Sequence, residues 1–409
     1  MWLYNLGISL YAGGIRLAAL WHGKARLWSE GRRNIFERME AAGRPSDRIV
    51  WVHAASLGEF EQARPIIERL RAEHPEYKIL LTFFSPSGYE IRKNYEGADY
   101  VFYLPADTPS NARRFLDIVH PEIAIFIKYE FWINLLSELR RRKVRSYIVS
   151  AIFRRNSVFF RPYGAMWRQA LETFDTLFVQ NVESKRLLSE IGFDNVVVAG
   201  DTRFDRVAQI AAAAQRVETI ERFRGGGRLF VAGSTWGPDE EILLPLVNAN
   251  PDVKFVIAPH EMDEGRIAHL MRDAKGGAVR YTQCDAATRF DDVQVLVLDT
   301  MGMLSSVYGS ATWAYVGGGF GVGIHNTLEA ATFGLPIAFG PNYGKFKEAR
   351  DMVSLGCAVS VRTAGELAAW FAPLRDDEET LRRASRTAKD YTARNQGATG
   401  IILRSIFNS

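Results

Sequence analysis

Residues 53–60, HAASLGEF, place a carboxylate, Glu59, in a turn made of small residues. The turn follows the apolar run of residues 49–52 and precedes a segment with helical spacing, as a strand-to-helix connection would. Such connections hold ligands in open α/β sheets, and a carboxylate there is suited to accept a proton as a general base. The simpler interpretation is that Glu59 favours the positive end of a helix dipole.

A glycine-rich segment, residues 316–341, is the second candidate site. Five of the eight residues from 316 to 323 are glycine, Gly318 and Gly319 among them, so the backbone can pass close to a ligand. The following HNTLEAA begins a helix whose N-terminus can face a phosphate, while Asn326 and Glu329 are placed to bind sugar hydroxyls. The spacing differs from GxGxxG with a later ribose-binding acid, which disfavours NAD. A purely structural glycine loop is the alternative.

Ser234 and Thr235 follow another apolar run, and Asp239 to Glu241 then open a helix. Hydroxyls and backbone N–H groups at such a point suit a phosphate. Capping of the helix by Ser234 or Thr235 explains the same pattern more simply.

Metal chemistry has no sequence support. The chain contains no HExxH, CxxC, GxSxG or GxxxxGK motif, and its seven histidines form no i, i+4 pair. We therefore expect a reaction that needs neither metal nor cofactor, in which glycine loops, helix ends and basic groups neutralise a leaving phosphate.

The elements that position these residues alternate between apolar runs and helical patterns, which predicts βα units and mostly parallel sheets. An Ala-rich helical stretch closed by three glycines, residues 206–228, separates two sets of such units. The prediction is an α/β fold of two Rossmann-like domains facing a cleft. We expect an N-terminal domain over residues 31–206, a C-terminal domain over residues 207–390, and a last helix over residues 391–409 that packs on the first domain.

The length of 409 residues accommodates two domains, and the net charge of +4 does not indicate nucleic-acid binding. Cys284 and Cys357 lack the spacing of a disulfide framework or zinc site. Residues 1–15 carry no charged side chain, and the first 30 residues combine amphipathic aromatics with basic residues. We expect residues 1–30 to form an uncleaved membrane anchor, inserted or lying in the interface, with a first core helix as the alternative.

Two stretches are basic, residues 140–145 and residues 153–168, and the second mixes cations with aromatics. They suit a phosphorylated, acylated acceptor at a membrane surface, and Arg154, Arg155 and Arg161 are the candidate acceptor-binding residues. The alternative is a solvated helix face beside core aromatics.

Several segments, taken in order, resemble the 3-deoxy-D-manno-octulosonic acid (Kdo) transferases of lipopolysaccharide synthesis. They are WVHAASLGEFEQARPII, PADTPSNARRFL, GDTRFD, DTMGML, VGGGFGVGIHNTLEAA and RNQGA. The resemblance implies a metal-independent, inverting GT-B glycosyltransferase on the cytoplasmic face of the inner membrane, with CMP-Kdo as donor and lipid IVA or a related lipid A precursor as acceptor.

The resemblance also assigns residues. The general base of the family falls on Glu59, beside Gly58 at the acceptor side, and its basic transition-state stabiliser falls on Arg203. Its donor-binding positions fall on Pro259, His260, Met301, Gly302, Met303, Asn326, Thr327, Leu328 and Glu329.

Three positions depart from the family pattern. Lys128 stands where ETELWPN has a glutamate, Met303 replaces the glutamate of DTMGEL, and His260 replaces the arginine of PRHPER. A cation at Lys128 can still stabilise a leaving phosphate, whereas Met303 retains only backbone contact. Two alternatives follow: a GT-B enzyme with a UDP-sugar donor, and an inactive membrane-peripheral binding protein of the same fold.

Overall fold

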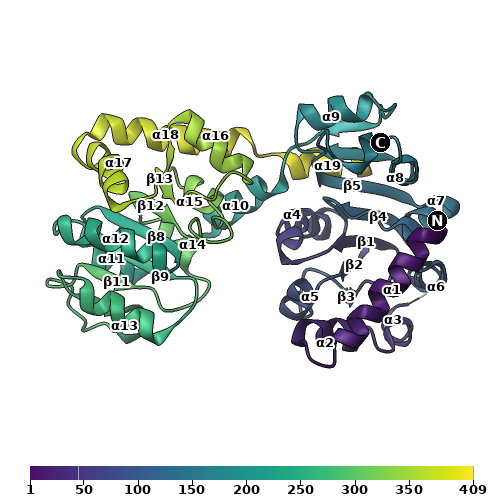
Figure 1. Cartoon of the computed structure of the whole chain (residues 1–409), viewed down its shortest axis with the longest axis horizontal. Helices are drawn as coiled ribbons and strands as arrows, with labels where there is room; N and C mark the ends of the chain where they lie inside the picture. The colour runs from purple at the N-terminus through teal and green to yellow at the C-terminus, as the bar shows by residue number, and fades with distance from the viewer. Residues whose placement is uncertain (45, 409) are drawn as a thin grey trace. The chain divides into compact units, whose positions relative to one another are not determined.

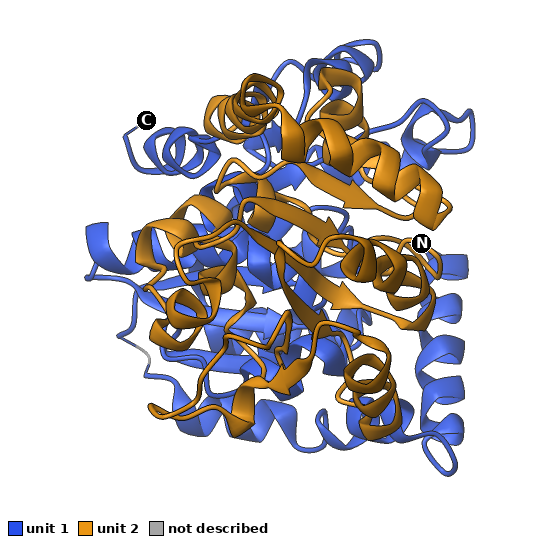
Figure 2. Cartoon of the chain, turned by 90° about the vertical axis from the view of Figure 1, so that its left-hand side faces the viewer, with its two compact units in different colours: residues 1–206, 396–409 blue, residues 207–395 orange. Residues whose placement is uncertain are grey.

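The structure is a computed structural model that describes residues 1–44 and 46–408. The chain divides into two compact units (Figure 2), unit 1 with residues 1–206 and 396–409, and unit 2 with residues 207–395. Over the described residues each unit holds one seven-stranded sheet, and every strand pair is parallel. The prediction of two parallel-sheet α/β domains is confirmed.

The sheet of unit 1 has the order β3-β2-β1-β4-β5-β6-β7, and Figure 1 labels its strands β1 to β5. Its strands are β1 (Ile49–Ala54), β2 (Lys78–Phe83), β3 (Tyr100–Tyr103), β4 (Pro121–Ile127), β5 (Arg145–Ala151), β6 (Thr176–Val179) and β7 (Val196–Val198). Its helices are α1 (Trp2–Ala18), α2 (Gly23–Glu30), α3 (Ile35–Ala42), α4 (Leu57–Glu73), α5 (Pro86–Arg92), α6 (Pro109–Val119), α7 (Ile133–Arg142), α8 (Ala165–Leu171), α9 (Val182–Ser189) and α19 (Ala398–Phe407), while α10 (Thr202–Ala213) crosses into unit 2.

The strands of unit 1 are uniformly apolar because helices cover both faces of the sheet. All six residues of β1 are buried. Trp51 packs in a cluster with residues of α6 and α7, whereas Val50 and Val52 pack in another cluster with residues of α4 and α19. Alternate residues of one strand thus supply two separate cores, which explains why the sequence shows a continuous apolar run instead of an alternating one.

The sheet of unit 2 has the order β10-β11-β9-β8-β12-β13-β14. Its strands are β8 (Leu229–Thr235), β9 (Lys254–Pro259), β10 (Ala278–Arg280), β11 (Val295–Val297), β12 (Trp313–Val316), β13 (Ile337–Phe339) and β14 (Ala358–Ser360). Its helices are α11 (Glu218–Arg224), α12 (Gly237–Ala249), α13 (Glu264–Asp273), α14 (Leu304–Tyr308), α15 (Leu328–Ala331), α16 (Lys347–Leu355), α17 (Ala364–Asp376) and α18 (Glu378–Arg394).

The strand orders fix where each unit can hold a ligand. In unit 1 the chain runs outward from β1 through β2 to β3 and then returns to β4 on the other side of β1. In unit 2 the equivalent reversal lies between β8 and β12. Open α/β sheets bind ligands beyond the carboxyl ends of the strands that flank such a reversal.

The C-terminal helix α19 packs against α4 within unit 1. The carboxylate of Asp205 accepts hydrogen bonds from the backbone N–H groups of Gly397 and Thr399, at 2.5 and 2.7 Å, and so caps the start of this helix. At its other end, Phe407 stacks on His74 with a centroid distance of 3.9 Å.

The N-terminal segment forms α1 and α2 on unit 1. The hydroxyl of Tyr4 donates to Asp107 at 2.6 Å, and Asn134 donates to the side chain of Asn5 at 2.9 Å. These bonds fix one face of α1 to the start of α7. Among the described helices, none combines the length and apolar character needed to span a bilayer.

Candidate active site

Glu59 lies in the first turn of α4, directly beyond the carboxyl end of β1. The helix begins after Ser56, whose hydroxyl donates to the Glu59 carboxylate instead of capping the backbone. Gly58 is exposed and Glu59 is half-buried. The turn thus presents an ionisable oxygen at the point where the order of the sheet reverses.

The neighbouring strand β4 is followed by Lys128, Tyr129 and Glu130. Lys128 adopts a left-handed backbone conformation, with φ of +63°, and its N–H donates to the carbonyl of Val149 at 2.9 Å. A side chain with a Cβ atom seldom adopts this conformation, so the chain turns sharply here for a local reason. The turn leaves Tyr129 exposed at the edge of the sheet beside the end of β1.

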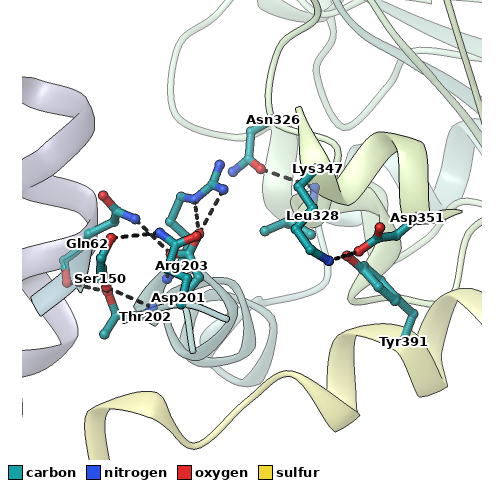
Figure 3. A network of polar contacts seen from close by, with 11 residues as sticks. Gln62, Ser150, Asp201, Thr202, Arg203, Asn326, Leu328, Lys347, Asp351 and Tyr391 are labelled. Carbon is teal, nitrogen blue, oxygen red and sulfur yellow. Dashed lines mark hydrogen bonds and ion pairs between the residues drawn. The ribbon is translucent and has the colours of Figure 1, made fainter. Parts of the chain in front are cut away.

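Arg203 lies in the first turn of α10 and is held by Asp201, the residue just before that helix (Figure 3). The Asp201 carboxylate accepts from the Arg203 Nε at 2.9 Å, from its backbone N–H at 3.0 Å and from the Gln62 side chain at 2.8 Å. Burial raises the pKa of Asp201, but the charge and hydrogen bonds of Arg203 outweigh it and the pKa is lowered. Asp201 is therefore a fixed anion that orients the guanidinium.

A second set of bonds attaches this segment to the sheet. The hydroxyl of Thr202 donates to the carbonyl of Gln62 at 2.7 Å and lies 3.1 Å from the hydroxyl of Ser150 (Figure 3). Ser150 is near the end of β5 and has a φ of +54°. Because Gln62 belongs to α4, the helix that carries Glu59 and the segment that carries Arg203 are positioned by the same contacts.

The hydroxyl of Tyr129 shows that these groups share one electrostatic environment. Its pKa is raised, first by burial of the hydroxyl and also by the charges of Asp201 and Glu59, while Arg154 and Arg203 act in the opposite direction. Coulombic effects of this kind need short separations. The charges of Glu59, Arg203 and Arg154 thus all act on the Tyr129 hydroxyl, beyond the carboxyl end of β4.

The other predicted acceptor-binding arginines lie in the same loop but have other contacts. Arg155 forms an ion pair with Glu190 at 3.0 Å, at an exposed position. Arg161 is exposed, and its carbonyl accepts from Arg168 at 3.0 Å. Of the three arginines, Arg154 is the one placed with Glu59 and Arg203.

A buried histidine beneath the turn was not among the predicted site residues. The side chain of His53 is fully buried, with one ring nitrogen 2.9 Å from the Thr82 hydroxyl and the other 3.1 Å from Glu130. Trp132 donates to the same Glu130 oxygen at 2.7 Å. The two strand ends are cross-linked by this set, and its sequence signal was the histidine that directly follows the apolar run of residues 49–52.

In unit 2 the glycine loop follows β12. Asp239, in the first turn of α12, accepts from the backbone N–H of Gly318 at 2.9 Å and from the Tyr315 hydroxyl at 2.8 Å. Gly318 has a φ of +90°, and a Cβ atom at Gly319 would lie 2.6 Å from the backbone of Gly340. Glycine is thus required at both positions, the first for its conformation and the second for space.

The segment after the loop carries the predicted sugar-binding groups. Asn326 donates to Glu329 at 3.0 Å and accepts from the backbone N–H of Leu328 at 3.1 Å, and Ser305 donates to the second oxygen of Glu329 at 2.9 Å. Thr327 is buried, and its hydroxyl has no hydrogen-bond partner within the described part of the chain. The helix α15 that begins here is short, from Leu328 to Ala331.

Ser234 and Thr235 lie at the end of β8, opposite the loop in the sheet. The predicted cap is wrong, because α12 begins after Trp236 and the Thr235 hydroxyl donates to Glu240 at 2.8 Å. Ser234 has a φ of +53°, and its carbonyl lies where a Cβ atom of Gly317 would otherwise be. Thr235 therefore has a structural role, and Ser234 borders the glycine loop.

Pro259 ends β9, and the next residue, His260, is exposed within an aromatic stack. The ring of His260 stacks on His325 with centroids 4.3 Å apart and on Trp236 at 4.8 Å. The Trp236 indole N–H donates to Nε2 of His325 at 3.2 Å. Burial, and then the nearby His260, lower the pKa of His325.

The segment of Met301, Gly302 and Met303 precedes α14. Met301 is 79% exposed and Gly302 has a φ of +85°, so the backbone makes an open turn there. Across the described residues, no group of three or more His, Cys, Asp or Glu side chains is placed to hold a metal ion. The predicted site residues thus form two sets, one in each unit, each at the carboxyl end of its sheet.

Comparison with known proteins bears on both units. Residues 32–206 match the family model described as 3-deoxy-D-manno-octulosonic-acid transferase (kdotransferase). The chain is 25% identical to the 3-deoxy-D-manno-octulosonic acid transferase of Haemophilus influenzae over 378 residues, 88% of this chain and 86% of that one. It is 28% identical to the enzyme of the same name from Bordetella pertussis over 373 residues, 87% of this chain and 86% of that one.

The predicted resemblance to the Kdo transferases is confirmed. The match to the family model includes Glu59 and Arg203, and the matches to the Haemophilus and Bordetella Kdo transferases extend over most of both units.

Solved structures agree on the fold. The UDP-GlcNAc 2-epimerase of Neisseria meningitidis has a TM-score of 0.62 at 16% identity and covers 88% of this chain and 100% of that one. Acinetobacter baumannii MurG has a TM-score of 0.57 at 12% identity and covers 89% of this chain and 100% of that one. At such identities the likeness describes the architecture, which is two parallel-sheet α/β domains resembling those of GT-B glycosyltransferases.

Proposed function

We propose that this chain transfers Kdo from CMP-Kdo to a lipid A precursor such as lipid IVA, with inversion at the anomeric carbon. The support is the similarity to Kdo transferases over most of the chain, together with a carboxylate, Glu59, at the sheet reversal of the domain that matches the family model.

In the proposed reaction an acceptor hydroxyl attacks the anomeric carbon of Kdo, and Glu59 takes the proton of that hydroxyl. The new carbon–oxygen bond forms as the bond to the CMP phosphate breaks, and the bond electrons leave with CMP. General-base assistance of this kind contributes about 10²- to 10⁴-fold to a rate. The Glu59 carboxylate accepts a hydrogen bond from the Ser56 hydroxyl, which holds one of its oxygens in place.

Arg203 is proposed to stabilise the charge on the departing phosphate. A guanidinium is suited to this because it stays protonated and presents several donors in one plane. Asp201 fixes its orientation, so little reorganisation is needed during the reaction. Arg154 is proposed to bind a phosphate of the acceptor, and Lys128 is a second candidate for the leaving phosphate. No metal or cofactor is required in this scheme.

The donor is proposed to bind unit 2, at the carboxyl end of its sheet. The glycine loop, held by Asp239, offers backbone amides for the phosphate, and Glu329 offers carboxylate oxygens for sugar hydroxyls. The remaining members of the proposed donor set are Ser234, Pro259, His260, Met301, Gly302, Met303, Gly318, Gly319, Asn326, Thr327 and Leu328. Thr235, already bonded to Glu240, would act through its backbone.

We further propose that unit 1 lies on the cytoplasmic face of the inner membrane. Five leucines, four of them on α1 and Leu20 just beyond its end, recur every three, four or seven residues and are each at least 42% exposed: Leu3, Leu6, Leu10, Leu17 and Leu20. Trp2 and Trp21 flank them and are also exposed. Spacing of this kind puts the leucines on one helix face, and an apolar face bounded by tryptophans suits the headgroup region of a bilayer.

The test is an in vitro assay with CMP-Kdo and lipid IVA, with products resolved by mass. Glu59→Gln should lower transfer by at least about a hundredfold while CMP-Kdo binding is retained. Glu61→Gln on the same helix is the matched control, because Glu61 is half-buried like Glu59 and pairs with Arg92 and Arg206, which are not among the proposed site residues. Near-normal turnover of Glu59→Gln, or transfer from a UDP-sugar in place of CMP-Kdo, contradicts the proposal. Full activity in the presence of a chelator is expected.

A further inference from the structure

Unit 1 contains a cavity of about 420 Å³ that none of the proposed catalytic or acceptor-binding residues lines. It lies among α1, α2, the start of α3 and the segment after β3. The side chains that matter for its chemistry are Arg16, Trp28, Arg32, Arg33, Asn34 and Glu37.

The cavity carries excess positive charge. Arg32 donates to three backbone carbonyls, those of Trp28, Phe84 and Leu104, at 2.8 to 3.0 Å, so its charge meets no carboxylate. Arg16 and Arg33 are exposed, and over the described residues neither forms an ion pair. The acid of the lining, Glu37, already pairs with Arg114 at 3.2 Å. The lining of the cavity thus holds three guanidinium groups and one carboxylate, and that carboxylate is already paired with Arg114.

The guanidinium of Arg32 packs against aromatic rings. Its guanidinium carbon lies 3.9 Å from the centre of the Trp28 ring and 4.7 Å from that of Tyr103. Burial lowers the pKa of Arg32 to about 9, which leaves the group protonated at neutral pH. Arg32 is half-buried, and a partly desolvated cation without a counter-charge is costly, so an anion bound beside it would be stabilised.

Trp28 supplies a second, independent indication of a ligand. It is 5% exposed, and its indole N–H has no hydrogen-bond partner within residues 1–44 and 46–408. A buried donor that is left unpaired costs about 1–3 kcal/mol, and native proteins leave few of them. Trp28 lines the cavity, and an acceptor oxygen there would satisfy this buried N–H once the indole turns toward it. The neutral donor and the arginines together select an oxyanion.

The position of the cavity indicates where that oxyanion comes from. Arg16 belongs to α1, the helix that carries four of the five exposed leucines of the apolar face described above. An anion bound there would lie at the edge of that face, at the depth where a bilayer carries its phosphates. Charge and apolar surface therefore match an anionic lipid on the same side of unit 1.

We propose that this cavity binds the phosphate group of an anionic membrane lipid. Arg16 and Arg33 contact the phosphate from the open side, Arg32 supplies a fixed charge below it, and the Trp28 N–H donates to one oxygen. The lipid is a bound anchor that is not consumed, and it goes beyond the proposed transfer reaction.

The cavity is also linked to the candidate active site. Phe84, whose carbonyl accepts from Arg32, packs on Trp28 and on Trp132, with centroids 6.0 and 4.6 Å away. Trp132 in turn donates to Glu130 beside His53, and the N–H of Phe84 donates to Ala55 in the turn before Glu59. A lipid phosphate in the cavity would therefore fix unit 1 with the carboxyl end of its sheet near the membrane.

The experiment titrates the full chain with dihexanoyl phosphatidylglycerol below its micelle concentration, with heat as the readout. We expect one saturable site. Arg16→Gln with Arg33→Gln should weaken binding at least tenfold, whereas Lys24→Gln with Arg26→Gln, an equal loss of charge on α2, should change it less than twofold. Trp28→Phe keeps the aromatic ring and should weaken binding several-fold.

Circular dichroism checks that each variant is folded, and Arg33→Gln alone serves if the double variant is not. No saturable binding by the wild type, or equal affinity in the arginine variants, would overturn the proposal. Equal affinity for dihexanoyl phosphatidylcholine would overturn the selection of an anionic lipid. Inorganic phosphate binding as tightly as the lipid would reassign the site to free phosphate. Because the probe is monomeric and no sugar is transferred, these results are independent of vesicle binding and of Glu59.

Discussion

The contact between Asp201 and Arg203 gives a quantitative prediction for the variant Asp201→Asn. Asparagine has nearly the same size and keeps one oxygen for the Gln62 side chain, so the change removes the charge with little change in packing. The guanidinium of Arg203 then loses two charge-assisted contacts to the carboxylate, at 2.9 and 2.8 Å.

Removing one partner of a buried ion pair costs about 3–5 kcal/mol. The side chain of Asp201 is 6% exposed but that of Arg203 is 28% exposed, so solvent compensates part of the loss. We expect a fall of about 1–3 kcal/mol in the free energy of unfolding of unit 1 at neutral pH. The exposed Asp194→Asn is the matched control and should change it by less than about 0.5 kcal/mol.

The pH dependence has a definite sign. The pKa of Asp201 is lowered in the folded protein, so its contribution is complete above the unfolded value of about 3.9 and disappears as the pH falls through the lower folded value. The stability difference between wild type and Asp201→Asn should therefore shrink below about pH 4. Urea unfolding followed by circular dichroism at pH 7 and pH 3.5 measures it.

The same variant tests the proposed role of Arg203. If Arg203 stabilises the leaving phosphate, loss of its orienting carboxylate should lower kcat about tenfold or more and change the KM for the acceptor little. Rescue by Asp201→Glu is expected to be partial, because the longer side chain restores the charge but not the geometry. A urea midpoint and a kcat that both remain within error of wild type would refute the reasoning.

Two further predictions concern other parts of the chain. The pKa of His325 is lowered by burial and by His260. The contribution of this side chain to stability is therefore complete above about pH 6.5 and is lost as the pH falls below that value. Between about pH 7.5 and pH 5.5 the melting temperature should fall further in the wild type than in His325→Gln. Replacement of Leu6, Leu10 and Leu17 by serine should lower partitioning onto phospholipid vesicles at least about tenfold, because each leucine loses part of the 1.5–3 kcal/mol that burial provides. The melting temperature should not fall, since these side chains are exposed, and unchanged partitioning would contradict the membrane proposal.

The fold was predictable because both sheets are covered on both faces. Each run such as residues 49–52 is apolar at every position, and helical patterns separate the runs, so the number and order of βα units could be read from the sequence. The strand order within a sheet has no such signal. The insertion of β11 between β9 and β10 depends on packing between strands that are distant in the sequence.

The candidate site was predictable only where one short segment carries the chemistry. Glu59 and Arg203 each lie in a recognisable motif, but their common environment depends on Tyr129, a residue from a third strand end. Asp201 was overlooked although it is two residues from Arg203, because a motif does not show which of its polar residues is buried. The Ser234–Thr235 cap was wrong for a similar reason, since the Thr235 hydroxyl is taken by a glutamate five residues further on.

The replacement of the family arginine by His260 changes the charge at this position, and the structure shows a physical reason that the sequence did not. A family arginine at this position would be a permanent cation, whereas His260 stacks at 4.3 Å on a second imidazole whose pKa it lowers. Two positive charges at that separation repel, and the Trp236 N–H already occupies Nε2 of His325. Burial and the neighbouring ring therefore favour the neutral form of His325. In the proposed reaction the permanent positive charge that neutralises the leaving phosphate would then come from Arg203. The buried carboxylate of Asp201 is important because it orients that arginine.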